Sequence, residues 1–174
     1  MRAVDTFRRV LVAFDGSPDA AHALWIAAAV ADAAGDGGEL VVLCVIARTL
    51  APEDNGEGRD GVLLRAQAET ILGELARGTL RGILPRTSVQ VVYSGGDSPG
   101  NVVRVYAQEK GFDILVLGRH GGAGRRKSTL GRVADRAVRA CLVPVLLVSA
   151  PDRETTPDRW TMPAQHGATR SRAS

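Results

Sequence analysis

The sequence predicts an α/β fold in which a doubly wound, five-stranded parallel sheet carries helices on both faces. Two observations predict this fold. First, apolar strand-like segments alternate strictly with helical segments along the chain. Second, most of the strand-like segments are continuous apolar runs, which are typical of parallel strands buried on both faces. Right-handed crossovers leave only a few strand orders, and we expect the doubly wound order 3-2-1-4-5.

The first two strands and the helix between them are marked by local signals. Val10–Phe14 is an apolar run and is expected to form the first strand. Ser17 is a natural N-cap, and Pro18 suits the first helical position that follows it. We expect this helix to continue to Gly35 and to be followed by a second apolar strand over Leu40–Ala47.

The middle of the chain is expected to form a loop, a long helix and a third strand. Residues 48–61 are polar and rich in glycine, proline and acids, which indicates a loop. The helix is expected over about residues 62–83, with Pro85 closing it. Ser88–Tyr93 alternates between apolar and polar residues, which favours a strand near the edge of the sheet.

The last third of the chain is expected to contribute two helices and two strands. Asp97 or Ser98 caps a helix that runs to Gly111, and Ile114–Leu117 and Val145–Val148 are the strands. Between these strands a helix begins near residue 130. Its apolar residues recur at helical spacing and are expected to share one face: Leu130, Val133, Ala134, Ala137, Val138 and Cys141.

Length and composition predict one cytoplasmic domain. We assign residues 1–150 to the domain and 151–174 to a disordered tail, because that tail holds three prolines and has no apolar period. The two cysteines, Cys44 and Cys141, are expected to be buried reduced thiols. The amino-terminal residues contain no apolar signal segment, and no apolar run is long enough for a membrane span.

A glycine-rich cationic loop follows the strand Ile114–Leu117 and leads into a helix. Glycine lets the backbone approach a ligand closely, and the N–H groups of a helix N-terminus attract anions, so the loop suits a phosphate chain. Residues 118–139 hold seven basic residues against one acidic residue, although the whole chain has a net charge of only +3. The polar residues of this region are Arg119, His120, Arg125, Arg126, Lys127, Ser128, Thr129 and Arg132.

Composition argues against nucleic acid as the anionic partner. Only 4% of the residues are aromatic, and outside the basic region the chain is net acidic. Proteins that bind single-stranded nucleic acid need aromatic rings for stacking. A local phosphate ligand is therefore favoured over nucleic acid.

Topology brings the glycine-rich loop to a distant acidic residue. In the doubly wound order the first and fourth strands are neighbours across the switch point, beyond which ligands bind. Asp15 and Gly16 end the first of these strands, and Gly118 and Arg119 end the other. We expect Asp15 and the loop to converge there, although Asp15 capping the turn that follows it is an alternative.

Four stretches together resemble the universal stress protein family. They are VLVAFDGS, LVVLCVI, DILVLGRHGGAG and LGRVADRAVRACLVPVLLV, with glycines spaced G-x2-G-x9-G at Gly118, Gly121 and Gly131. The resemblance covers about Arg8 to Ser149 and implies a Rossmann-like fold. It also implies a homodimer, with the final strand Val145–Val148 as its seam.

The glycine spacing is similar to that of the ATP-binding branch of the family. The resemblance implies ATP as the ligand and leaves Mg²⁺ open, with Asp15 at the ribose or a metal and the backbone around Val45 at the adenine. It places Leu117 and Gly118 under the ribose, and Gly121, Gly131 and the two following residues around the phosphates. The full nucleotide-binding set is Ala13, Asp15, Val45, Leu117, Gly118, His120, Gly121, Gly131, Arg132 and Val133.

Arg132 departs from the family pattern, in which serine or threonine follows the last glycine. A guanidinium can clamp phosphate through two hydrogen bonds. It can also fill the phosphate space, or turn outward to pair with Asp135. These three alternatives stay open, and Ser128 and Thr129 are candidates to replace the lost hydroxyl. For His120, a loop residue with backbone bonds is favoured over a general base.

The resulting prediction is an ATP-binding stress or signalling protein that couples occupancy to conformation, dimer state or an unidentified protein partner. Two alternatives remain: a family member that binds no nucleotide and acts by protein interaction, and a slow ATPase or self-phosphorylating protein. No His–Asp pair or second carboxylate is evident after Asp15, so the sequence predicts poor turnover.

Overall fold

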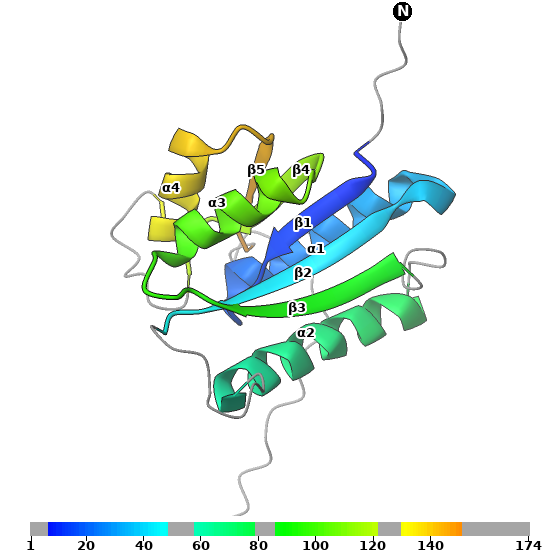
Figure 1. Cartoon of the computed structure of the whole chain (residues 1–174). Coiled ribbons are helices and arrows are strands. Elements are labelled where there is room, and N and C mark those ends of the chain that lie inside the picture. Colours follow the sequence, from blue (N-terminus) through cyan, green and yellow to red (C-terminus); the bar gives the residue numbers. More distant parts are fainter. Residues whose placement is uncertain (1–6, 49–57, 79–85, 122–129, 151–174) are drawn as a thin grey trace, which may run out of the picture.

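A computed structural model describes residues 7–48, 58–78, 86–121 and 130–150 of the chain. Five parallel strands form one sheet in the order β3-β2-β1-β4-β5, as the sequence predicts (Figure 1). The strands are β1 (Arg9–Ala13), β2 (Glu39–Ile46), β3 (Thr87–Tyr93), β4 (Ile114–Gly118) and β5 (Val145–Val148). The helices are α1 (Pro18–Ala33), α2 (Gly58–Gly78), α3 (Pro99–Glu109), α4 (Arg132–Ala140) and the short 3-10 turn η1 (Gly35–Gly37).

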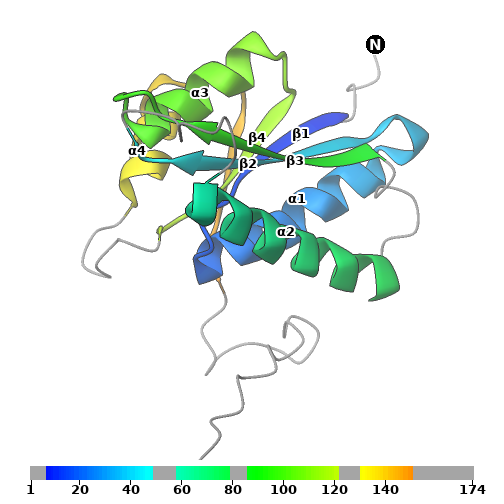
Figure 2. The ribbon, with the colours of Figure 1, turned by 60° about the horizontal axis from the view of Figure 1, so that its bottom comes forward.

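The sheet is covered on both faces (Figure 2). α1 and α2 lie on one side, and α3 and α4 lie on the other. Alternate residues of β1 enter the two layers, since Val10 and Val12 pack in the cluster with α1 and α2, and Leu11 packs in the other. This period of two is the reason that a continuous apolar run forms a strand here.

β1 is the centre of the sheet and lies at the switch point. It pairs with β2 on one side and with β4 on the other. The chain therefore leaves β1 and β4 in neighbouring positions, although about a hundred residues separate them in sequence. The carboxyl ends of these two strands define the edge where the doubly wound fold binds ligands.

Helix boundaries differ from the predicted ones at two glycine-rich places. α2 begins at Gly58 and not near residue 62, because its packing against β2 and β3 outweighs the low helix propensity of its glycines. α4 begins at Arg132 and not at residue 130. Gly131 has the extended backbone of an N-cap, with φ −69° and ψ 156°, so it stands before the helix.

The predicted buried face of α4 is partly wrong. Ala134 and Ala137 are buried, whereas Val138 is 51% exposed. The helix packs closely against α3, where Gly100 lies beside Val133 and Arg136, so Val138 falls on the outer side.

Both predicted serine caps are present. Ser17 and Ser98 cap α1 and α3, as their side chains accept hydrogen bonds from Ala20 N–H and Asn101 N–H. Cys44 is buried and Cys141 half-buried, and both are free thiols.

The predicted tail 151–174 and the residues 122–129, which include Arg125, Arg126, Lys127, Ser128 and Thr129, lie outside the described residues. Within the described ranges, no helix combines the length and apolarity that crossing a membrane requires.

Candidate nucleotide pocket

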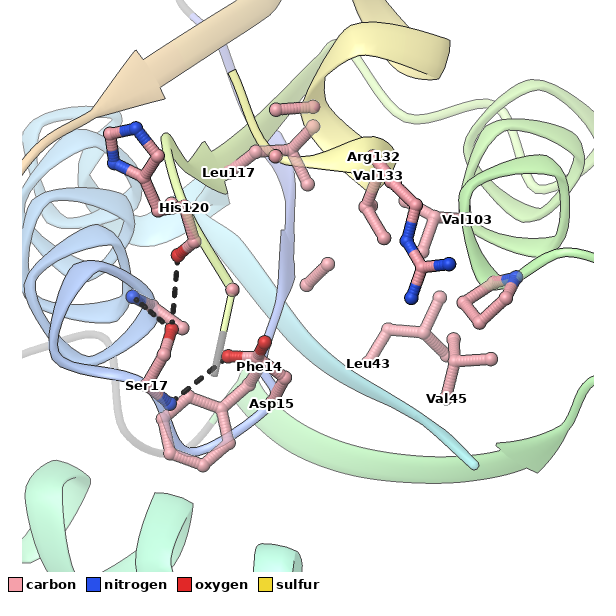
Figure 3. Close-up of a pocket in the computed structure, with 17 residues that line it drawn as sticks. Phe14, Asp15, Ser17, Leu43, Val45, Val103, Leu117, His120, Arg132 and Val133 are labelled. Atoms are coloured by element: carbon pink, nitrogen blue, oxygen red, sulfur yellow. Dashed lines mark hydrogen bonds between the residues drawn. The ribbon is translucent and has the colours of Figure 1, made fainter. Parts of the chain in front are cut away.

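A pocket of about 230 Å³ opens beyond the carboxyl ends of β1, β2 and β4 (Figure 3). Its position is the one that the doubly wound topology predicts. All ten residues of the predicted set line it: Ala13, Asp15, Val45, Leu117, Gly118, His120, Gly121, Gly131, Arg132 and Val133. The structure therefore brings the predicted residues together around one cavity.

Seven further residues, which were not predicted from the sequence, also line the pocket. Phe14 and Ser17 lie between β1 and α1, Leu43 lies in β2, and the others lie in α1, α3 and α4: Ala20, Pro99, Val103 and Ala134. Leu43 could have been predicted from the alternation of side chains along a strand. It stands two residues before Val45 and therefore on the same face of β2. Ser17 was predicted only as a helix cap.

The glycines of the loop stand where backbone segments cross closely. A Cβ atom on Gly118 would lie 2.8 Å from the backbone of Asp19 and Ala20, so only glycine lets β4 pass the start of α1. The N–H of Gly131 donates to the carbonyl of Arg119 at 2.8 Å. This bond brings the two ends of the loop together at the pocket.

Asp15 and the loop converge at the pocket as topology predicts. A Cβ atom on Gly121 would lie 2.7 Å from Oδ2 of Asp15, so the carboxylate lies directly against the loop. Its other oxygen, Oδ1, accepts a hydrogen bond from Ser17 N–H at 3.0 Å. Asp15 thus caps the turn after β1 with one oxygen and presents the other to the loop, so the two interpretations of this residue are compatible.

The N-terminus of α4 supplies a second polar wall. Gly131 is its N-cap and provides no side chain to bond the first N–H groups. The first N–H groups of an α-helix have no intrahelical acceptor and carry its positive dipole end. Arg132, Val133 and Ala134, which form this first turn, all line the pocket.

Arg132 reaches across the pocket from this turn. Figure 3 shows its side chain extended toward Leu43 and Val45. Asp135 does not hold it, because the carboxylate of Asp135 pairs with Arg139 at 2.9 Å. The predicted alternative of an outward Arg132–Asp135 pair is therefore wrong. Among the described residues, Arg132 forms no hydrogen bond or ion pair of its own, which leaves its guanidinium available to a ligand.

His120 takes part in a His–Asp pair with Asp19, whereas the sequence had indicated no such pair. Its Nδ1 lies 3.1 Å from Oδ2 of Asp19, and its backbone N–H donates to the same oxygen at 3.0 Å. The ring lies on the far side of the loop from Arg132 (Figure 3). The carbonyl of His120 accepts a hydrogen bond from Ser17 Oγ at 3.3 Å. The pair therefore fixes the loop and does not direct a base into the cavity.

The opposite wall of the pocket is apolar. Leu43 and Val45 from β2, Val103 from α3 and Leu117 from β4 contribute to it. Asp15 is the one carboxylate in the described lining, and no cluster of three or more metal-ligating side chains occurs among the described residues. A divalent cation here would depend on oxygens that the ligand itself supplies.

Comparisons with known proteins agree with this architecture. The model of the universal stress protein family matches residues 6–149. A universal stress protein of Methanocaldococcus jannaschii is 36% identical over 56 residues, a segment that covers 32% of this chain. That segment spans only 33% of the relative's own length.

Solved structures show the same fold. The universal stress protein UspA of Lactobacillus plantarum has a TM-score of 0.60 at 20% identity, covering 82% of this chain and 97% of its own. A universal stress protein in complex with cAMP has a TM-score of 0.62 at 20% identity, covering 84% and 99%. A family protein of Arabidopsis thaliana with AMP bound has a TM-score of 0.58 at 18% identity, covering 87% and 97%.

Proposed function

The chain belongs to the universal stress protein family, and on that premise we propose that its pocket binds an adenine nucleotide, with ATP as the ligand. The observation that carries the proposal is the division of one pocket into two unlike halves. One half offers the loop backbone, the uncapped start of α4 and Arg132, and the other offers apolar side chains from β2, α3 and β4. A nucleotide has the same two parts, a polyanion and a flat apolar base.

Each half suits one part of the nucleotide. Backbone N–H groups at Gly121 and, in the first turn of α4, at Arg132 and Val133 would donate to phosphate oxygens, where the helix dipole favours negative charge. The base would lie against Leu43 and Val45, and the ribose over Leu117 and Gly118. Asp15 would accept hydrogen bonds from the ribose hydroxyls, because an ionised carboxylate only accepts.

The relatives support an adenine ligand. Two proteins of the same fold carry AMP and cAMP, and both ligands share adenine and ribose with ATP. ATP is preferred here because Arg132, whose side chain is extended toward Leu43 and Val45 in the structure, would turn toward the phosphates and add a cation there. If Mg²⁺ accompanies ATP, the phosphate oxygens would supply most of its ligands, and Asp15 would be the protein carboxylate available to it.

In the cell, the proposed role is a stress or signalling response in which occupancy changes conformation, dimer state or a partner's binding. Hydrolysis is a minor candidate. The His120–Asp19 pair is the feature that favours it, yet its ring lies away from the pocket (Figure 3). With no base directed at a water molecule, bound ATP is expected to be released unchanged after long incubation.

Calorimetric titration with ATP tests the proposal. We expect saturable one-site binding to the wild-type protein and a loss of about tenfold or more in Gly121→Val, because the new side chain would displace Asp15. Gly73→Ala is the matched control, since a Cβ at Gly73 has only Arg77 Nη1 near it, at 3.9 Å. Absence of binding at millimolar ATP would reject nucleotide binding and favour a protein-interaction role.

A further inference from the structure

Asp19 joins three separate parts of the fold through one carboxylate. It stands in the first turn of α1, and its side chain is only 15% exposed. Oδ2 accepts hydrogen bonds from the N–H of His120 at 3.0 Å and lies 3.1 Å from His120 Nδ1. Oδ1 accepts from the N–H of Ala150 at 2.8 Å. Because a carboxylate can only accept, Nδ1 is the protonated ring nitrogen in this contact.

The loop and the end of β5 are fixed to each other at this point. Arg119 N–H donates to the carbonyl of Val148 at 2.7 Å, which continues the β4–β5 pairing into the loop. The Asp19 carboxylate then bridges the next residue of the loop to Ala150. Gly118 rests on the backbone of Asp19 itself. The first residues of the loop therefore cannot shift without disturbing α1 or the residues after β5.

The hydrogen bonds that the Asp19 carboxylate accepts are stronger than hydrogen bonds between neutral groups. A hydrogen bond to a partly buried carboxylate is charge-assisted, and the N-terminal turn of α1 stabilises the negative charge. Removing the carboxylate would leave two backbone N–H groups without their acceptor, at a cost to local order. Asp19 is not among the residues that line the pocket, so it acts on a ligand only through the loop.

We propose that Asp19 is a positioning residue that holds Arg119–Gly121, the first residues of the glycine-rich loop, in their binding geometry and couples them to the residues after β5. The proposal rests on the proposed function, since the loop is taken to bind phosphate. Coupling is reciprocal. Occupancy of the pocket is therefore transmitted to Ala150, which lies outside the cavity and next to the edge strand.

Affinities for ATP and adenosine separate this role from a general loss of structure. In Asp19→Ala we expect ATP to bind at least about tenfold more weakly, while the affinity for adenosine changes by less than about twofold. Asp19→Asn keeps the size and one acceptor oxygen, and should fall between Asp19→Ala and the wild type. Asp32→Asn, a carboxylate removed near the other end of α1, is the control and should change neither affinity.

Two results would overturn the positioning role. One is an equal loss of ATP and adenosine affinity in the Asp19 variants, and the other is no loss of either. If the wild-type protein binds neither ligand, the proposed function fails and the positioning role fails with it.

Amide hydrogen exchange tests the coupling without any nucleotide. Both Asp19 variants are expected to exchange the amides of His120 and Ala150 faster, by about tenfold in Asp19→Ala. The amide of Ala20, which bonds Ser17 Oγ, serves as the internal reference. Unchanged exchange at His120 and Ala150 would show that other contacts hold the loop and would reject the coupling.

Discussion

Arg132 is the one arginine or lysine in the described lining of the pocket. It stands where the resemblance to the family implies serine or threonine. Its guanidinium lies in the pocket without a partner among the described residues. The outward pairing with Asp135 is wrong, which leaves two alternatives. The guanidinium either binds the nucleotide or occupies its space.

We expect Arg132→Ala to weaken ATP binding by about tenfold, because a charged hydrogen bond to phosphate contributes about 1.5 kcal/mol or more. Arg132→Lys keeps the charge but loses the two-pronged geometry, so it should recover only part of the affinity. Titrations of both variants with ATP and adenosine provide the measurement. Tighter binding in Arg132→Ala would instead show that the side chain blocks the site.

His22 gives the protein a pH dependence that can be assigned to one group. Its Nδ1 is buried and has no hydrogen-bond partner among the described residues. Burial lowers the pKa of His22 below its usual 6.5, and the nearby charge of Asp19 opposes that shift. In the unfolded chain the imidazole binds a proton more readily than in the folded protein.

Stability from neutral His22 is therefore fully present above pH 6.5 and is lost as the pH falls below that value. We expect the free energy of unfolding to drop between about pH 7.5 and pH 5.5, and to drop less in His22→Gln, which does not titrate. Urea unfolding of both proteins at the two pH values measures the difference. An equal drop in both would assign the effect to another group.

The prediction of single residues from sequence was uneven for a physical reason. Asp15 and Gly121 could be placed together because strand order alone brings the ends of β1 and β4 side by side. The Asp19–His120 pair could not, because an acidic residue in the first turn of a helix is sufficiently explained by the helix dipole. A side chain with a local role gives no sign in the sequence of a second role across 101 positions.

Among the elements, the contact between α3 and α4 sets the position of the first turn of α4, which lines the pocket. A Cβ atom on Gly100 would lie 3.0 Å from Cβ of Arg136 and 3.2 Å from Cα of Val133. The two helices approach this closely only because residue 100 is glycine. The spacing of α4 from α3 thus depends on one missing side chain.

Gly100→Val is expected to force the helices apart and to lower the free energy of unfolding by about 1–3 kcal/mol. The start of α4 moves with the helix, so the ATP affinity should fall as well. Chemical unfolding together with ATP titration measures both effects. A variant that keeps both wild-type values would mean that the turn is positioned by other contacts.

Strands were predicted more accurately than helix ends. Apolar runs such as Val10–Phe14 have only one stable placement when both faces of a sheet are covered. Helix ends depend on small energies near glycine, and tertiary packing decides them. α2 therefore begins before its predicted start, whereas α4 begins after it.

For the molecule as a whole, we propose that two chains associate through β5. This strand is at one edge of the sheet, and its first three residues are only half-buried. Leu142, just before the strand, is 89% exposed. An apolar edge of this kind is stabilised when a second subunit covers it.

Leu142→Glu is expected to shift the protein toward monomer, because it introduces charge at this edge without touching the core. Leu63→Glu on α2 is the control, since Leu63 is 59% exposed at the opposite end of the sheet. Sedimentation of both variants and the wild type gives the oligomeric state. If Leu63→Glu alone dissociates the dimer, the interface lies on α2.

The Asp19 carboxylate links the proposed dimer edge to the pocket. It accepts hydrogen bonds from Ala150, just after β5, and from His120 of the pocket loop, so ATP binding and association would share a structural element. This connection offers a physical route from occupancy to dimer state, which the family resemblance leaves unexplained.

An NMR titration of backbone amides with ATP tests most directly whether ATP binds in the pocket at the β1–β4 switch point. We expect saturable shifts that are largest at Gly118, Gly121, Gly131 and Val133, with a smaller shift at Ala150 and none along α2. Shifts that stay absent at millimolar ATP, or that cluster on α2 and β3, would contradict the account.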